Sequence, residues 1–228
     1  MKKFIVKITE LLFPKNIKCI VCEEELADPS NFSICPKCFN KLPYITGKAC
    51  EICGEKINSD ANLCLACKHE LPEFNRSFSP FLYEYPINYL IKELKYNNKK
   101  YLAETLGNFL VDCYIKNNLK ADVVVPVPLF EKRQKQRGYN QSYLLARQFK
   151  KINLEVLPDV LIRTRETLTQ TNLTKTERKE NMQNAFLVTD KNKIKDKTIL
   201  LIDDVYTTGS TLNECAKILK AKGAYKVY

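Results

Sequence analysis

The fold of the C-terminal part of the chain is decided by Ile199 to Thr211, which read ILLIDDVYTTGST. The apolar run at the start of this stretch predicts a buried strand. A helix is expected at 209–220, because Leu212, Ala216 and Leu219 recur at helical spacing. A strand that passes through a polar turn into a helix is the repeating unit of parallel α/β sheets. We therefore expect an α/β domain around this stretch.

The same alternation of strands and helices extends outward through residues 75–228. Strands are predicted at 121–128 (ADVVVPVP), 160–163, 185–189, 198–203 and 224–228, and helices at 86–97, 102–113 and 140–149, the last capped by Asn140. Strands that alternate with helices pair in parallel through right-handed crossovers. The expected fold class is α/β, a mostly parallel sheet with helices on both faces.

The turn between the strand and the helix has the chemistry of a sugar-phosphate site. A helix N-terminus attracts anions, and Gly209 allows a tight turn and a close approach of phosphate. Hydroxyl donors are supplied by Thr207, Thr208, Ser210 and Thr211. Asp203 and Asp204 suit a ribose diol and a Mg²⁺ ion. The alternative is a solvated turn followed by an ordinary helix cap.

Eight of the ten cysteines fall in four C-x-x-C pairs, with 12, 11 and 10 residues between successive pairs. Two such turns direct four thiolates at one tetrahedral Zn²⁺. We expect two structural zinc ions, held by Cys19, Cys22, Cys35 and Cys38 and by Cys50, Cys53, Cys64 and Cys67. A crossed pairing, in which the first and third pairs share an ion, is the alternative. Redox chemistry also uses C-x-x-C, but four consecutive pairs argue against it.

The cysteine-rich composition ends near Leu71–Phe74, so we expect a zinc-binding domain at 1–74, a double zinc ribbon with an N-terminal helix, and a second domain at 75–228. Metal-ligand spacing of the cysteines indicates a reducing, cytoplasmic compartment. No apolar run reaches the roughly 18 residues that a membrane span requires. We therefore expect no membrane span.

At Ile199–Thr211 the chain resembles the type I phosphoribosyltransferases, whose motif for phosphoribosyl pyrophosphate (PRPP) has this order of residues. One departure is Tyr206, where that family commonly has Met, Leu or Ile. With VPVPLFEKRQKQRGYNQ at 125–141, QTNLTKTERKENMQNAF at 170–186 and the cysteine pairs, nearly the whole chain resembles the ComF (ComFC, GntX-like) competence-protein family. The resemblance implies a PRPP-binding domain fused to a zinc module, with a role in natural transformation or DNA uptake.

The resemblance also implies roles for individual residues. Asp203 and Asp204 would contact the ribose hydroxyls, with Mg²⁺ bound alongside, and 207–211 would bind the 5′-phosphate. The charged loop that carries Arg133, Lys135 and Arg137 would bind pyrophosphate; its alternative is a solvated basic loop. The stretch 164–184 occupies the place of a mobile loop that closes over the reaction, with a disordered or partner-binding loop as the alternative.

Two functions follow from these features. The first is an enzyme that transfers a phosphoribosyl group to an unidentified acceptor. The second is a non-catalytic single-stranded DNA binding factor with a regulatory PRPP pocket, because the whole net charge of +11 lies in residues 75–228. Tyr96, Tyr139 and Tyr143 lie near those charges in the sequence, which fits a groove that stacks bases and follows the phosphates of a strand. Other competence proteins are further candidate partners. The single histidine, His69, argues against a histidine-based catalytic triad.

Overall fold

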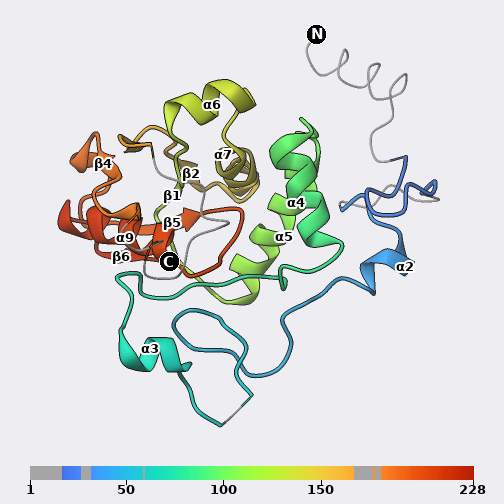
Figure 1. The fold of residues 1–228 in the computed structure, drawn as a ribbon, viewed down its shortest axis with the longest axis horizontal. Helices are drawn as coiled ribbons and strands as arrows, with labels where there is room; N and C mark the ends of the chain where they lie inside the picture. Colours follow the sequence, from blue (N-terminus) through green and yellow to red (C-terminus); the bar gives the residue numbers. More distant parts are fainter. Residues whose placement is uncertain (1–16, 27–31, 59, 167–176, 178–180) are drawn as a thin grey trace.

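Four parallel strands form the central sheet, in the order β2-β1-β5-β6 (Figure 1). The structure is a computed structural model that describes residues 17–26, 32–58, 60–166, 177 and 181–228, so the expected N-terminal helix lies outside the described residues. The strands are β1 (Val123–Pro126), β2 (Glu155–Val156), β5 (Thr198–Ile202) and β6 (Lys226–Val227). In the central pair, Val123 lies opposite Ile199 and Pro126 opposite Ile202. The expected parallel sheet is confirmed.

Helices cover both faces of this sheet. Alternate strand residues point to opposite sides, so the apolar strands present apolar side chains on both faces. Val124 and Leu200 pack in one core with α4 (Ile87–Tyr96), α5 (Leu102–Lys116), α7 (Gln141–Ala146) and η1 (Arg147–Ile152). Val123 and Ile199 pack in the other core with α9 (Ser210–Ala221). All four of these side chains are buried. Burial on both faces explains why the two central strands are continuously apolar.

The expectation of parallel pairing is wrong for two of the predicted strands. β3 (Leu161–Arg163) and β4 (Phe186–Val188) form a separate antiparallel pair, with Ile162 opposite Leu187. Parallel strands need a crossover that packs back on the sheet, and 164–185 is too polar to supply an apolar helix face. A short 3₁₀ turn, η3 (Lys191–Lys193), leads from β4 toward β5.

The expected charged loop after β1 is also wrong, because its residues form a helix, α6 (Glu131–Arg137). The sequence EKRQKQR consists of good helix formers, and Glu131 and Lys135 form an ion pair of 2.5 Å one turn apart. Gly138 ends the helix in a left-handed conformation with φ of 78°. Asn140 then caps α7 as predicted, accepting hydrogen bonds from the backbone of Ser142 and Tyr143.

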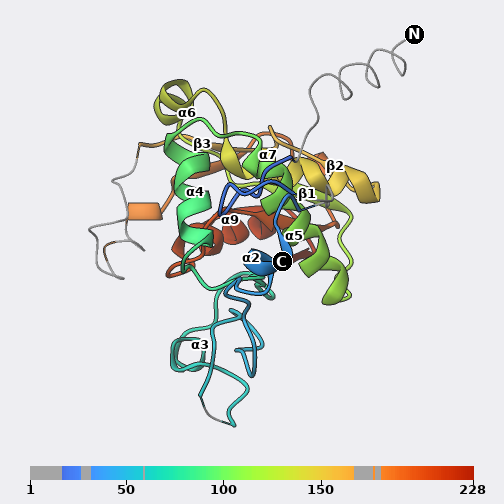
Figure 2. The same cartoon turned by 90° about the vertical axis from the view of Figure 1, so that its right-hand side faces the viewer.

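Each zinc ribbon is joined to a different core. The first ribbon, with α2 (Pro36–Phe39), places Cys19, Ile34 and Leu42 in the core with α4 and α5. The second ribbon, with α3 (Leu65–His69), places Cys50, Cys53 and Cys67 in the core with α9. It projects from the body of the α/β domain (Figures 1 and 2). The cysteine-rich segment thus packs directly on both layers of the sheet domain.

Among the residues that the structure describes, no helix is long and apolar enough to cross a bilayer.

Candidate functional site

The two central strands define the position of the site. From β1 the chain moves to β2 on one side, and it later returns to place β5 on the other side. Ligands of open α/β sheets bind outside the carboxyl ends of the strands where the strand order reverses in this way. Asp203 and Asp204 directly follow β5, and Val127 follows β1. The carboxylate pair therefore lies at the topological switch point.

Side chains from two helices and one backbone N–H group hold the two carboxylates in place. Ser142, in the first turn of α7, donates a hydrogen bond of 3.0 Å to Oδ1 of Asp203, and the backbone N–H of Asp204 donates one of 2.9 Å to the same atom. Lys95 of α4 forms an ion pair of 2.9 Å with Oδ1 of Asp204. Oδ2 of Asp204 is buried and has no hydrogen-bond partner among the described residues. A buried acceptor left unpaired is costly, so this oxygen points to a ligand that donates to it or coordinates it.

Burial of the pair changes its titration. The pKa of Asp203 is raised to about 7, first because burial disfavours the charged form and then because Asp204 carries like charge; Lys95 acts in the opposite direction. Burial lowers the pKa of Lys95, but the ion pair with Asp204 outweighs this and leaves the pKa raised. Near neutral pH Asp203 is therefore partly protonated in the unliganded site, and a bound cation would displace this proton.

This pKa predicts how stability depends on pH. Because the pKa of Asp203 is about 7 in the folded state and about 4 in an unfolded chain, the folded state binds the extra proton between these values. The free energy of unfolding therefore falls as pH rises toward 7 and loses this dependence above it. Asparagine does not titrate, so the free energy of unfolding of Asp203→Asn should not fall in this way. As the pH rises from 5.5 to 7, the difference in free energy of unfolding should shift by about 2 kcal/mol in favour of the variant, as measured by urea denaturation. A pH-independent difference between the two proteins would contradict the prediction.

The loop between β5 and α9 has the geometry of an anion cradle. Gly209 is the N-cap of α9 with φ of 73°, and no side chain caps this helix. Because glycine has no side chain to offer the first backbone N–H groups of the helix, this helix start suits an anion site. Oγ1 of Thr208 and Oγ of Ser210 lie 2.8 Å apart, so these hydroxyls face the same space. Thr207 and Thr211 flank them in the loop.

Tyr206 connects this loop to the second zinc ribbon. Its ring meets the ring of Phe74 edge to face at a centroid distance of 6.5 Å. Its hydroxyl lies under Gly209, where an added Cβ would come within 2.6 Å of the hydroxyl oxygen. The departure from the common Met, Leu or Ile therefore has a structural explanation: the larger ring fills the space between the loop and the ribbon.

We expect Tyr206→Ala to lower the free energy of unfolding by about 2 kcal/mol or more, because it leaves a cavity beside Phe74. Tyr206→Phe retains the ring contact and should stay close to the wild type. Urea denaturation of the zinc-loaded proteins measures both changes. Equal stability of the alanine variant and the wild type would show that the ring does not support the loop.

The two arginines predicted to bind pyrophosphate have different neighbours in the structure. Arg133 lies close enough to Arg163 of β3 to affect its titration: the pKa of Arg163 is lowered, first by burial and then by the charge of Arg133, while Asp203 acts in the opposite direction. Arg137 instead donates to the side chain of Gln141 and lies over the Tyr96 ring at 5.5 Å. The pyrophosphate role of both residues stays a prediction.

Sequence reasoning missed three residues of the site: Lys95, Ser142 and Arg163. Lys95 and Ser142 contact the carboxylates but come from helices assigned only to packing. A signal existed for Lys95, since it is a lysine on the mostly apolar side of α4 beside Leu94 and Ile91. Most of the predicted mobile loop at 164–184 lies outside the described residues, but Arg165 donates to the carbonyls of Asn181 and Gln183 at its base.

Both cysteine clusters fit zinc, with the predicted sequential pairing. The four Sγ atoms of each cluster lie within 4.8 Å of one another, in the sets Cys19, Cys22, Cys35, Cys38 and Cys50, Cys53, Cys64, Cys67. The Sγ separations of 3.8 Å for Cys22–Cys35 and 3.6 Å for Cys53–Cys64 match the roughly 3.8 Å edge of a ZnS₄ tetrahedron. The crossed alternative is therefore wrong, and His69 is exposed and belongs to neither cluster.

The stacking groove predicted from three tyrosines does not form. Tyr139 is buried and donates its hydroxyl to the carbonyl of Leu94, and Tyr143 packs against the α7 core. Only Tyr96 is well exposed, at 71%. A tyrosine that lies near charged residues in the sequence can be either exposed or buried in the fold, so the sequence alone could not distinguish these cases.

Two family comparisons agree with this arrangement. Residues 8–68 match the double zinc ribbon domain, and residues 101–228 match the phosphoribosyl transferase domain. The fold and the two kinds of site therefore define a protein in which a double zinc ribbon is joined to a phosphoribosyltransferase domain.

Relatives that share both parts are more specific. Competence protein F of Haemophilus influenzae is 33% identical over 221 residues, which cover 93% of this chain and 94% of that protein. DNA utilization protein YhgH of Escherichia coli K12 is 29% identical over 92% and 93%, and competence protein ComFC of Bacillus subtilis is 28% identical over 90% and 89%. The chain belongs to the competence protein F family.

A search of solved structures finds the glutamine PRPP amidotransferase of B. subtilis, in a complex with ADP and GMP. The similarity has a TM-score of 0.33 and 19% identity, and covers 48% of this chain and 22% of that one. Similarity at this level supports no conclusion about the function of this chain.

Proposed function

We propose that the chain binds PRPP with Mg²⁺ at the switch point between β1 and β5. The observation that carries the proposal is the buried Oδ2 of Asp204, which has no hydrogen-bond partner among the described residues. Asp204 lines the same groove as Gly209 and Ser210 at the N-terminus of α9. A ribose hydroxyl or a Mg²⁺ ion would satisfy this oxygen. The 5′-phosphate would accept hydrogen bonds from the loop at 207–211.

The charges around the site suit the pyrophosphate group of PRPP. Arg163 lies within electrostatic range of both Arg133 and Asp203, and a pyrophosphate group would stabilise the two neighbouring cations. Mg²⁺, when bound, would neutralise charge on the pyrophosphate. Ser142 and Lys95 would hold the carboxylates in the orientation that accepts the ribose hydroxyls.

We further propose transfer of the phosphoribosyl group to an acceptor that has yet to be identified. The acceptor nucleophile would form a bond to ribose C1 while the bond from C1 to pyrophosphate breaks, and pyrophosphate would leave with the electron pair. A groove of about 1470 Å³ runs from Asp203 and the phosphate loop to the second ribbon, past Phe74 and Leu71. This exceeds the usual volume of a small-ligand pocket, so it leaves room for an acceptor beside the sugar.

The relatives' names support a role for this chain that involves DNA. Two of them are called competence proteins and one a DNA utilization protein. We propose that this chain likewise acts in DNA uptake, in the cytoplasm and together with other competence proteins. Its net charge of +11 favours a polyanionic partner.

Calorimetry of the zinc-loaded protein tests the binding step. We expect PRPP to bind with Mg²⁺ present and to bind much more weakly when Mg²⁺ is omitted, with ribose 5-phosphate and pyrophosphate each binding more weakly than PRPP. Equal affinity for pyrophosphate and PRPP would mean that the sugar is not recognised. Release of pyrophosphate that depends on an added nucleobase, amine or nucleic acid would identify transfer; its absence with all three classes would overturn the catalytic part.

A further inference from the structure

Five tyrosines between residues 83 and 101 lie on the outside of the molecule. The exposed fractions are 46% for Tyr83, 66% for Tyr85, 39% for Tyr89, 71% for Tyr96 and 62% for Tyr101. Isolated exposed apolar residues need no explanation, but a concentration of large aromatic rings indicates a binding surface. We call this surface the tyrosine face.

Helix α4 organises the tyrosine face. Its buried side carries Ile87, Leu90, Ile91 and Leu94. Tyr85, which immediately precedes the N-cap of α4, is followed on the opposite side by Tyr89, Lys92 and Tyr96, at steps of three or four residues. The rings of Tyr85 and Tyr89 lie 6.4 Å apart with an interplanar angle of 40°. The aromatic rings therefore follow the solvent side of one helix.

Cations accompany the rings. Arg137 lies over the ring of Tyr96 at 5.5 Å, yet that tyrosine remains 71% exposed. Lys92 and Lys100 are also exposed. Glu93 carries the one buried carboxylate of α4, and Lys99 neutralises it in an ion pair of 2.6 Å. A row of aromatic rings flanked by positive charge is the pattern that binds a single nucleic-acid strand by base stacking and phosphate contacts.

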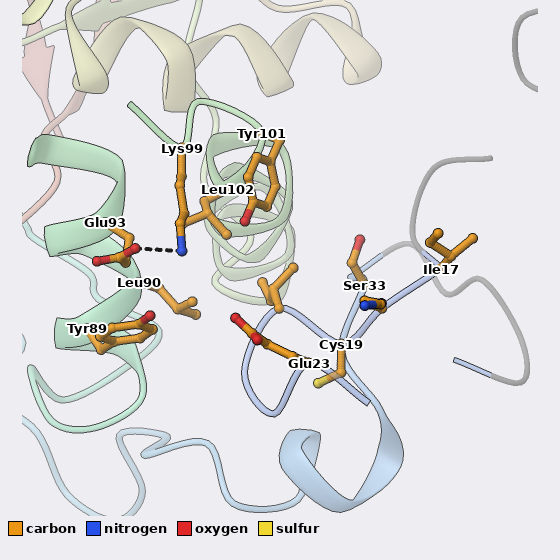
Figure 3. Close-up of a pocket in the computed structure, with 12 residues that line it drawn as sticks. Ile17, Cys19, Glu23, Ser33, Tyr89, Leu90, Glu93, Lys99, Tyr101 and Leu102 are labelled. Carbon is orange, nitrogen blue, oxygen red and sulfur yellow. Dashed lines mark ion pairs between the residues drawn. The ribbon is translucent and has the colours of Figure 1, made fainter. Parts of the chain in front are cut away.

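A pocket of about 390 Å³ opens next to this face, between α4, the start of α5 and the first zinc ribbon. Figure 3 shows Tyr89 and Tyr101 on opposite sides of the pocket, with Glu23 and Lys99 reaching toward the space between them. The volume suits a single nucleobase rather than an oligomer. The carboxylate of Glu23 would repel a phosphate but would accept a hydrogen bond from the exocyclic amine of a base.

We propose that the tyrosine face binds single-stranded DNA, with bases stacked on Tyr85, Tyr89 and Tyr96 and one base entering the pocket between Tyr89 and Tyr101. Phosphates would lie along Lys92, Lys100 and Arg137. The inference goes beyond the PRPP site and does not require it, although the family's connection with DNA supports the choice of ligand.

Fluorescence anisotropy with a labelled 15-nucleotide single strand of mixed sequence tests the proposal. We expect Tyr89→Ala with Tyr96→Ala to weaken binding about 30-fold or more, because each ring contributes stacking to a base. Tyr89→Phe with Tyr96→Phe keeps both rings and should change affinity little. Tyr225→Ala is the matched control, since Tyr225 is 66% exposed with Lys226 over its ring at 5.1 Å but lies beside β6.

Several outcomes would overturn the proposal. These are wild-type affinity in the double alanine variant, an equal loss in the Tyr225→Ala control, or equal binding of duplex DNA of the same sequence. Self-association that the double variant abolishes without a change in DNA affinity would assign the face to a second copy of the chain. The Asp203→Asn, Asp204→Asn variant should keep wild-type DNA affinity, so a failure of the PRPP proposal is distinguishable from a failure of this one.

Discussion

Replacing both carboxylates at the switch point, Asp203→Asn with Asp204→Asn, is expected to weaken PRPP binding on the order of 100-fold or more in calorimetry with Mg²⁺. The substitution keeps the shape of both side chains and removes the charges that would accept ribose hydroxyls or coordinate Mg²⁺. Each charge-assisted hydrogen bond contributes about 1.5 to 3 kcal/mol, so the loss of two accounts for this factor. Oδ2 of Asp204, without a partner among the described residues, is the atom whose replacement should matter most.

The same substitution also leaves Lys95 without its carboxylate partner, so folding must be measured independently. Asp122→Asn is the matched control for binding. Asp122 accepts a hydrogen bond of 2.7 Å from the backbone of Thr198, at the opposite end of β5 from the site. Asp122→Asn should retain PRPP affinity even if it costs some stability. Undiminished PRPP binding by the folded double variant would refute the assignment of the site.

Much of this site could be predicted from local sequence. A strand, two carboxylates and a glycine-hydroxyl turn are contiguous, so ILLIDDVYTTGST predicts both its own structure and the kind of ligand. Asn140 at the start of α7 is another local signal, because a cap acts on the next few residues. The cysteine spacing likewise predicted both zinc clusters.

What could not be predicted depends on contacts between distant segments. Ser142 and Lys95 reach the carboxylates only because the sheet brings α7 and α4 to the same end of β5. Helix α6 was missed for a different reason: it has no buried residue, so it carries no apolar period. β2 pairs with β1 but has only two residues. A strand of this length is too short for an alternating pattern to be recognised in the sequence.

The separate attachment of the two ribbons gives the second large prediction. The second ribbon contacts the phosphate loop through Phe74 and Tyr206, whereas the first ribbon lines the pocket beside Tyr89. Loss of one thiolate from a four-cysteine site removes much of the zinc affinity that holds a ribbon folded. Cys67→Ser should therefore weaken PRPP binding about tenfold and spare DNA. Cys38→Ser should weaken DNA binding by a similar factor and spare PRPP.

Zinc content distinguishes this local effect from general unfolding. Each serine variant should release about one zinc ion per chain to a chromogenic chelator, while the other cluster remains loaded. Cys113→Ser is the matched control, because Cys113 is a half-buried cysteine of α5 outside both clusters. It should retain both zinc ions and both affinities. Each ribbon contacts a different site, so each variant should affect the binding of only one ligand. If either variant lost both PRPP binding and DNA binding, the ribbons would contribute only to the stability of the whole protein.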